Sequence, residues 1–291
     1  MKNFIKTNYN IYPKKIYKKD NIYFFFSSNE KIVIVKTDKD KNYLSNLANI
    51  SNELYRNGIM VHTFLLNING EYYTKNENEY IVLLKINNNS NVVTLKGINK
   101  YDINNSFNLE KIDIVNEMEK KIDTLEKEMT EYNKEYPIIQ ESINYFIGLS
   151  ENAIQMIKTI NIYNNSIIHI ISLDKYNSYE FNNPFNLKLG NKMYDYALYF
   201  KNKFYNEYIN YDELFKVIKS NSKEDLICFY CFMLYQKEYF DCVKEILLNR
   251  IEEKSIYKYI NKIKEYKELL KYIKDNLQNI NEIMELEWID K

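Results

Sequence analysis

The chain has 291 residues, of which 45% are hydrophobic, so it can build a substantial buried core. Forty basic and forty acidic residues cancel, and the resulting zero formal charge argues against a nucleic-acid binder. Three cysteines indicate a reduced compartment. The N-terminus lacks the apolar core of a signal peptide, and the longest apolar run, residues 226–235, is too short to span a bilayer. We therefore expect a cytoplasmic protein without a membrane span.

The first part of the chain is predicted to be a small sheet with one helix. Short segments rich in β-branched and aromatic residues predict strands at residues 14–19, 21–27, 31–36, 61–67 and 80–86. Between the third and fourth strands, Leu44, Leu47 and Leu54 lie at helical spacing within residues 43–57. Gly58 follows as the expected C-cap. This order of strands and helix is the order of a kinase small lobe.

The remainder of the chain is predicted to be helical, which makes the fold class α+β. A stripe of apolar residues alternates in steps of three and four: Val115, Met118, Ile122, Leu125, Met129, Tyr132 and Tyr136. With Pro137 opening a second helix, the stripe predicts a long helical hairpin over about residues 108–160. Three heptads are a minimal coiled-coil signal, so packing within the chain is preferred over pairing with a partner helix. From about residue 211 onwards, the pattern is almost entirely helical.

Several short motifs resemble the aminoglycoside-phosphotransferase-like kinases, especially the branch of spore coat CotS-type proteins. They are the strand Val33-Ile34-Val35-Lys36, the turn at residues 57–61, the helical segments at residues 145–157 and 235–241, and the aspartate-led helix Met193-Tyr194-Asp195-Tyr196-Ala197-Leu198. The resemblance implies a bilobal kinase-like fold, with residues 1–88 as the N-lobe and residues 89–291 as the C-lobe. It also implies that Lys36 would hold ATP phosphates with Glu53 as its partner. Asp195 would anchor the catalytic loop through backbone hydrogen bonds.

The same resemblance shows which catalytic groups this chain lacks. Active members carry a histidine, a small residue and an aspartate, with an asparagine five residues later, whereas this chain has His169-Ile170-Ile171 and then Tyr176. Phosphoryl transfer needs a carboxylate to accept the hydroxyl proton and further groups to hold Mg²⁺. The metal-binding aspartate is missing from residues 180–184, and Asp174 and Glu180 are the remaining carboxylate candidates. No glycine lies in the turns near residues 20–21 and 27–29, where close backbone approach to phosphates would need one.

Two other candidate sites have simpler structural explanations. Cys228 and Cys231 have C-x-x-C spacing, but they lie in an apolar helical stretch without a second metal-ligand pair, so buried core cysteines are expected. His169 is flanked by isoleucines and is expected to be a satisfied histidine in a buried strand. We therefore expect no metal site.

The sequence therefore predicts a catalytically inactive, kinase-like protein that acts as a binding or scaffolding module with a protein partner. By resemblance, its setting would be sporulation or the cell envelope of a low-GC Gram-positive bacterium, with spore association possible for a cytoplasmic protein. One alternative is a diverged small-molecule phosphotransferase that uses Mg-ATP through Asp174 or Glu180. Another is a helical assembly protein that dimerises through the stripe at residues 115–136. No cofactor is expected under the leading hypothesis, and ATP with Mg²⁺ only under the first alternative.

Overall fold

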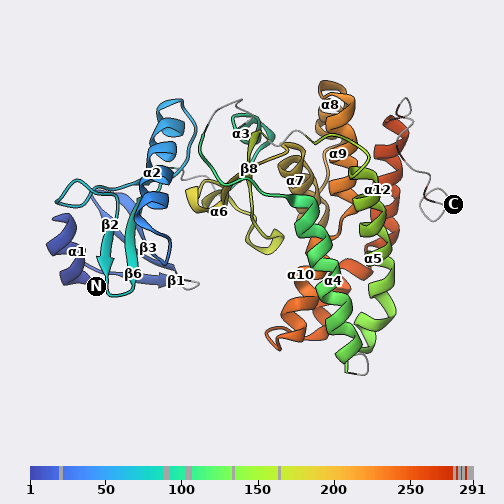
Figure 1. The fold of residues 1–291 in the computed structure, drawn as a ribbon, viewed down its shortest axis with the longest axis horizontal. Helices are drawn as coiled ribbons and strands as arrows, with labels where there is room; N and C mark the ends of the chain where they lie inside the picture. The colour runs from blue at the N-terminus through green and yellow to red at the C-terminus, as the bar shows by residue number, and fades with distance from the viewer. Residues whose placement is uncertain are drawn as a thin grey trace.

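The computed structural model describes residues 1–19, 22–87, 92–101, 107–132, 135–162, 165–277, 280, 283 and 286. A lobe built on a β-sheet lies at one end of the molecule and a lobe of helices at the other (Figure 1). Between them lie β8, α3 and α6 (Figure 1). The predicted α+β class and two-lobed arrangement are confirmed. The boundary predicted at about residue 88 falls in residues 88–91, which lie outside the described ranges.

The sheet lobe is antiparallel throughout. Its strands run in the order β1 (Tyr17–Lys19), β2 (Ile22–Ser27), β3 (Glu30–Thr37), β6 (Glu79–Lys85) and β4 (Thr63–Phe64), and β5 (Thr74–Asn76) pairs with β6. Residues on one face of β3 pack in a small core with α1 (Lys2–Tyr9). The opposite face of the sheet packs against α2 (Lys41–Arg56). The helix α1 and the strand β5 were not predicted, because both are short and mostly polar in sequence.

Local sequence explains where α2 begins and ends. The Asp40 side chain accepts hydrogen bonds from the backbone N–H groups of Asn42 and Tyr43 at 2.8 and 2.9 Å, which satisfies two donors of the first turn. Leu44 and Leu47 are buried on its inner face. Beyond the end of the helix, Gly58 has a φ of +82°, a conformation that glycine adopts without steric cost, so the predicted C-cap is present.

The helical lobe contains a long hairpin of α4 (Ile114–Tyr132) and α5 (Pro137–Ile157), which pack against each other. Helices of the same lobe that follow in the chain include α8 (Tyr211–Ser220), α9 (Lys223–Leu234), α10 (Lys237–Leu247), α11 (Tyr257–Ile260) and α12 (Ile263–Asn276), with a 3₁₀ turn, η3, at Glu253–Ile256, and α3 (Leu95–Asn99) lies between the lobes. From the predicted stripe, Met118, Ile122, Leu125 and Met129 are buried within the chain. A helix from a second molecule could not reach these side chains, so the structure does not support dimerisation through the stripe.

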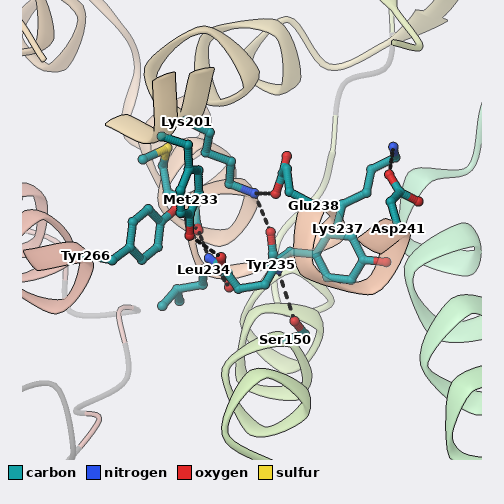
Figure 2. Close-up of polar contacts among 11 residues, drawn as sticks. Ser150, Lys201, Met233, Leu234, Tyr235, Lys237, Glu238, Asp241 and Tyr266 are labelled. Carbon is teal, nitrogen blue, oxygen red and sulfur yellow. Dashed lines mark hydrogen bonds and ion pairs between the residues drawn. The ribbon is translucent and has the colours of Figure 1, made fainter. Parts of the chain in front are cut away.

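The centre of the helical lobe contains a buried ion pair. Nζ of Lys201 lies 3.0 Å from a carboxylate oxygen of Glu238, and both side chains are less than 5% exposed (Figure 2). The same ammonium also donates to the backbone carbonyl of Tyr235, at the corner between α9 and α10. Cys228 and Cys231 of α9 are buried free thiols, and burial raises the pKa of Cys228 to about 12. Thiols held in the protonated form are poor nucleophiles and poor metal ligands, which agrees with their predicted core position.

Among the described residues, no helix combines the length and apolar character that a membrane crossing needs.

Candidate functional site

The segment from residue 166 to residue 206 contains two short paired strands, separated by short helical turns, and ends in a long helix. In chain order it contains β7 (Ser166–His169), the 3₁₀ turn η1 (Leu173–Lys175), α6 (Ser178–Phe181), the 3₁₀ turn η2 (Pro184–Asn186), β8 (Leu187–Gly190) and α7 (Met193–Asn206). β7 and β8 are antiparallel, and Ser166 lies opposite Gly190. The polypeptide between these strands, residues 170–186, is where the sequence predicted the remains of a catalytic loop.

Asp195 fixes the end of β7. Its Oδ1 accepts a hydrogen bond from the backbone N–H of His169 at 2.9 Å, and its Oδ2 lies 2.6 Å from Nδ1 of the His169 ring. Both side chains are buried. This backbone contact is the type that the sequence suggested for Asp195. Because both carboxylate oxygens have a partner on the same residue, Asp195 acts as a structural clamp in this geometry.

Aromatic rings fill the space around His169. The Phe181 ring stacks on the imidazole with centroids 3.7 Å apart, and the Tyr101 ring meets it edge-on at 4.5 Å. The Tyr101 hydroxyl donates to Oδ1 of Asn182 at 3.2 Å. Burial, and then the nearby charge of Asp195, raise the pKa of Tyr101. This environment is dry and aromatic, and it holds His169 in place as a buried structural residue.

The resemblance places Ile171 and Tyr176 at the positions of the catalytic carboxylate and the metal-binding amide. Ile171 is 4% exposed and belongs to the large hydrophobic core. The hydroxyl of Tyr176 is buried without a hydrogen-bond partner among the described residues, and burial raises its pKa well above the usual value. A phosphoryl-transfer site needs a carboxylate and a metal-binding amide at these positions. Neither an alkyl side chain nor a neutral buried phenol provides those groups.

The weaker carboxylate candidates are not brought together. Asp174 is exposed in η1, and its charge acts on Lys258 and Tyr259 in and beside α11. Glu180 accepts a hydrogen bond from the Asn186 side chain at 2.9 Å. Asn183 caps η2 by accepting the backbone N–H of Phe185. Within the described ranges, no group of three His, Cys, Asp or Glu residues could hold a metal ion.

Lys36 does not form the ion pair that the resemblance implied. Its Nζ lies 3.4 Å from Glu79 on β6, and both side chains are nearly half exposed. Glu53 points to solvent from α2. The reason is the alternation of a strand: Lys36 shares a face with Ile32 and Ile34, which pack on the α1 side of the sheet and not on the α2 side. An exposed pair of this kind contributes little to stability.

Lys31, which the sequence did not single out, is the lysine that faces the helical lobe. Because side chains alternate between the two faces of a strand, Lys31 points to the same face of β3 as Val33, and Lys36 points to the opposite face. The ammonium of Lys31 sits 4.6 Å from the centre of the Phe24 ring and 5.8 Å from that of Tyr179, on α6. Counting alternate residues along β3 from those that pack against α2 would have identified it.

His62 joins the two lobes. Its backbone N–H donates to the carbonyl of Asn182 at 2.9 Å, and its Nε2 lies 3.1 Å from the carbonyl of Tyr179. The His62 and Tyr179 rings are 5.3 Å apart, and Phe64 meets Phe185 at 5.8 Å beside them. The pKa of His62 is lowered to about 4, chiefly by burial; the hydrogen bond to Tyr179 opposes this effect and the positive charge of Lys31 adds to it. The ring is therefore neutral at pH 7, with Nε2–H as the donor to Tyr179.

The segment 177–186 thus fastens to the sheet lobe by backbone hydrogen bonds and aromatic packing. The ring of Tyr179 lies 5.8 Å from the ammonium of Lys31. A cavity of about 300 Å³ remains beside this contact, lined by residues 59–60, by residues of the 92–101 segment and by Ser178, Phe181 and Asn182. Sequence reasoning missed His62 and Tyr179, because their pairing depends on residues more than a hundred positions apart.

Comparison with known proteins agrees with this fold. The family model described as Spore coat putative kinase YutH matches residues 2–280. No curated protein matches the chain in sequence. An aminoglycoside phosphotransferase from Alicyclobacillus acidocaldarius is similar in structure, with a TM-score of 0.66 and 8% identity over 96% of this chain and 97% of that chain.

Two further solved structures are similar over most of their length. Spectinomycin phosphotransferase APH(9)-Ia, in complex with ADP and spectinomycin, has a TM-score of 0.56 and 11% identity over 90% of this chain and 93% of that chain. The amicoumacin kinase hAmiN, in complex with AMP-PNP and Ca²⁺, has a TM-score of 0.53 and 10% identity over 97% and 93%. Identities this low establish a shared fold and leave the chemistry of this chain to its own residues.

Proposed function

The chain belongs to the spore coat YutH kinase family, and from this premise we propose that it is a catalytically inactive kinase-like protein that serves as a binding or scaffolding module. The observation that carries the proposal is the pair Ile171 and Tyr176, both buried where phosphoryl transfer needs a carboxylate and a metal ligand. The helix that positions the loop, led by Asp195, is intact. The chain therefore keeps the residues that hold the fold and lacks those that handle metal and phosphate.

A combined binding and transfer assay tests the inactive state. We expect no rise in the melting temperature of the protein at about 5 mM Mg-ATP. Binding would be detected by this measurement, because a ligand at a hundred times its Kd stabilises the folded state by about 2.7 kcal/mol. We also expect no transfer of radiolabelled γ-phosphate to small hydroxyl or amine compounds. The matched variants are Lys31→Ala and Lys36→Ala, which remove lysines from opposite faces of the same strand. Phosphate transfer by the wild type that either variant abolishes would refute the proposal.

The alternative of a diverged small-molecule phosphotransferase is supported by the fold, since the similar solved structures include an ADP complex and an AMP-PNP complex. It predicts a Mg-ATP-dependent thermal shift. Loss of that shift in Lys31→Ala, but not in Lys36→Ala, would place the nucleotide between the lobes. Loss in Lys36→Ala alone would support the lysine assignment that the resemblance implied.

The scaffolding role implies a protein partner during spore formation. A fluorescent fusion expressed in the native sporulating host is expected to concentrate around the forming spore. An even distribution throughout the mother cell at every stage would contradict that setting. The variant Tyr208→Ala changes a side chain that is 92% exposed on the helical lobe, so we expect its fusion to localise as the wild-type fusion does.

A further inference from the structure

A cavity of about 340 Å³ lies in the helical lobe between α4 and α10. These two helices pack against each other, and Figure 1 shows them side by side on the lobe. The floor of the cavity is apolar and aromatic: Ile114, Met118 and Leu125 come from α4, Tyr194 from α7, and Tyr235 and Phe240 from the α9–α10 corner and α10. Pockets of 300–1,000 Å³ with an apolar lining and a few polar groups are typical of small-molecule sites.

The rim of this cavity is formed by lysines. Lys120 and Lys121 project from α4, and Lys237 and Lys244 from α10, against the carboxylates of Glu117 and Glu128. Asp241 beside them pairs with two lysines: it lies 2.7 Å from Nζ of Lys237 and also bonds Lys121 (Figure 2 shows the Lys237 contact). Among the side chains that line the cavity, four lysines face two carboxylates.

Burial is the main cause that lowers the pKa of Lys121. The charge and the hydrogen bond of Asp241 oppose it, and the ammonium groups of Lys237 and Lys244 add smaller lowering effects. A second anionic partner would stabilise the charged form of this partly buried lysine, which lies next to two other cations. Lys244 is exposed and forms no ion pair within the described part of the chain, so it is available to provide a contact to that anion.

We propose that this cavity binds a small organic anion, with a compact apolar or aromatic body on the tyrosine-lined floor and one carboxylate, sulfonate or phosphate group at the lysine rim. The apolar floor supplies hydrophobic contact, and the lysines fix the orientation of the charged group. Lys31, Lys36 and Tyr179 do not line the cavity. Ile170, at the start of the segment 170–186, does line it, so the cavity adjoins that segment.

A matched pair of probes tests the charge requirement. We expect 1-naphthoate to bind, by isothermal titration calorimetry, at least about tenfold more tightly than its neutral counterpart 1-naphthamide. Raising the ionic strength from about 0.05 M to 0.5 M should weaken naphthoate binding, because the lysine rim is open to solvent. Equal affinity for the two probes, or no binding of naphthoate at millimolar concentration, would overturn the proposal.

Three variants locate the bound anion. Lys244→Met removes an exposed rim charge with little risk to folding, and the double variant Lys121→Met with Asp241→Asn removes one charge of each sign. We expect each to weaken naphthoate binding by about threefold or more, without changing naphthamide binding. Lys216→Met, an exposed lysine on α8, is the matched control and should leave both affinities unchanged. Naphthoate binding that is unaffected by Lys244→Met and by the double variant would show that the anion binds elsewhere and would refute the assignment.

Discussion

Acidification is expected to weaken the contact between the two lobes through one residue, His62. Its side chain is fully buried, and its Nε2–H bonds the carbonyl of Tyr179 on α6. Its other ring nitrogen, Nδ1, is buried without a hydrogen-bond partner among the described residues. Protonation would therefore place a second donor and a positive charge in a dry site, next to the ammonium of Lys31.

The size of the effect follows from the two pKa values. Burial lowers the pKa of His62 from an ordinary value of 6.5 to about 4 in the folded protein. Between these values the unfolded chain binds more protons than the folded one, so stability is complete above pH 6.5 and is lost as the pH falls toward 4. One pKa unit corresponds to about 1.4 kcal/mol, so the single histidine should reduce the free energy of unfolding by about 2 kcal/mol at pH 5.

The variant His62→Gln isolates this contribution from other titrating groups. Its side-chain amide can donate to the Tyr179 carbonyl, as Nε2–H does, but it does not titrate. Urea unfolding of both proteins at pH 7, 6 and 5 gives the difference in their free energies of unfolding. We expect the wild type to lose about 2 kcal/mol relative to His62→Gln between pH 7 and pH 5. A difference that stays constant with pH would refute the reasoning.

Three further predictions concern stability and are checked by urea unfolding at pH 7. Lys201→Met leaves the buried carboxylate of Glu238 unpaired and should lower the free energy of unfolding by about 3–5 kcal/mol. Adding Glu238→Leu should restore part of this loss. A Lys201→Met variant as stable as the wild type would contradict the prediction. Asp195→Ala removes both partners of His169 and should cost at least about 2 kcal/mol, and a neutral result would show that the clamp is dispensable. Gly190→Ala places a methyl group 2.3 Å from Cδ1 of the buried Ile168 and should cost about 1–3 kcal/mol, whereas unchanged stability would mean that Ile168 moves freely.

Much of the architecture could be predicted from the sequence, because it depends on local patterns. The run of β-branched apolar residues in β3, the helical spacing of α2 with Gly58 behind it, and the apolar stripe of α4 are signals that each segment carries by itself. The family resemblance drew attention to Asp195. Segment boundaries differed by a few residues, and the helical pattern after residue 211 is divided among α8 to α12.

The site was harder to predict, since its contacts join distant parts of the chain. Lys36 was selected by its place in a short motif, but the face of the strand on which a lysine lies decides which groups it can reach. Lys31, and not Lys36, lies on the face of β3 that is turned towards Tyr179. His62 appeared to be an isolated strand residue until the fold placed it against Tyr179. Residue types at a position can be judged from the sequence, whereas their partners cannot.

The sequence alone determined which side chains, Ile171 and Tyr176, stand where the resemblance places the catalytic carboxylate and the metal-binding amide. Only the tertiary structure decided what surrounds them. Burial and aromatic packing place Tyr179 between the lobes, and the approach of α4 to α10 gathers lysines from two helices around one cavity. The difference arises because chemical identity is a property of each residue, while burial, charge density and shape are created by segments far apart in the chain.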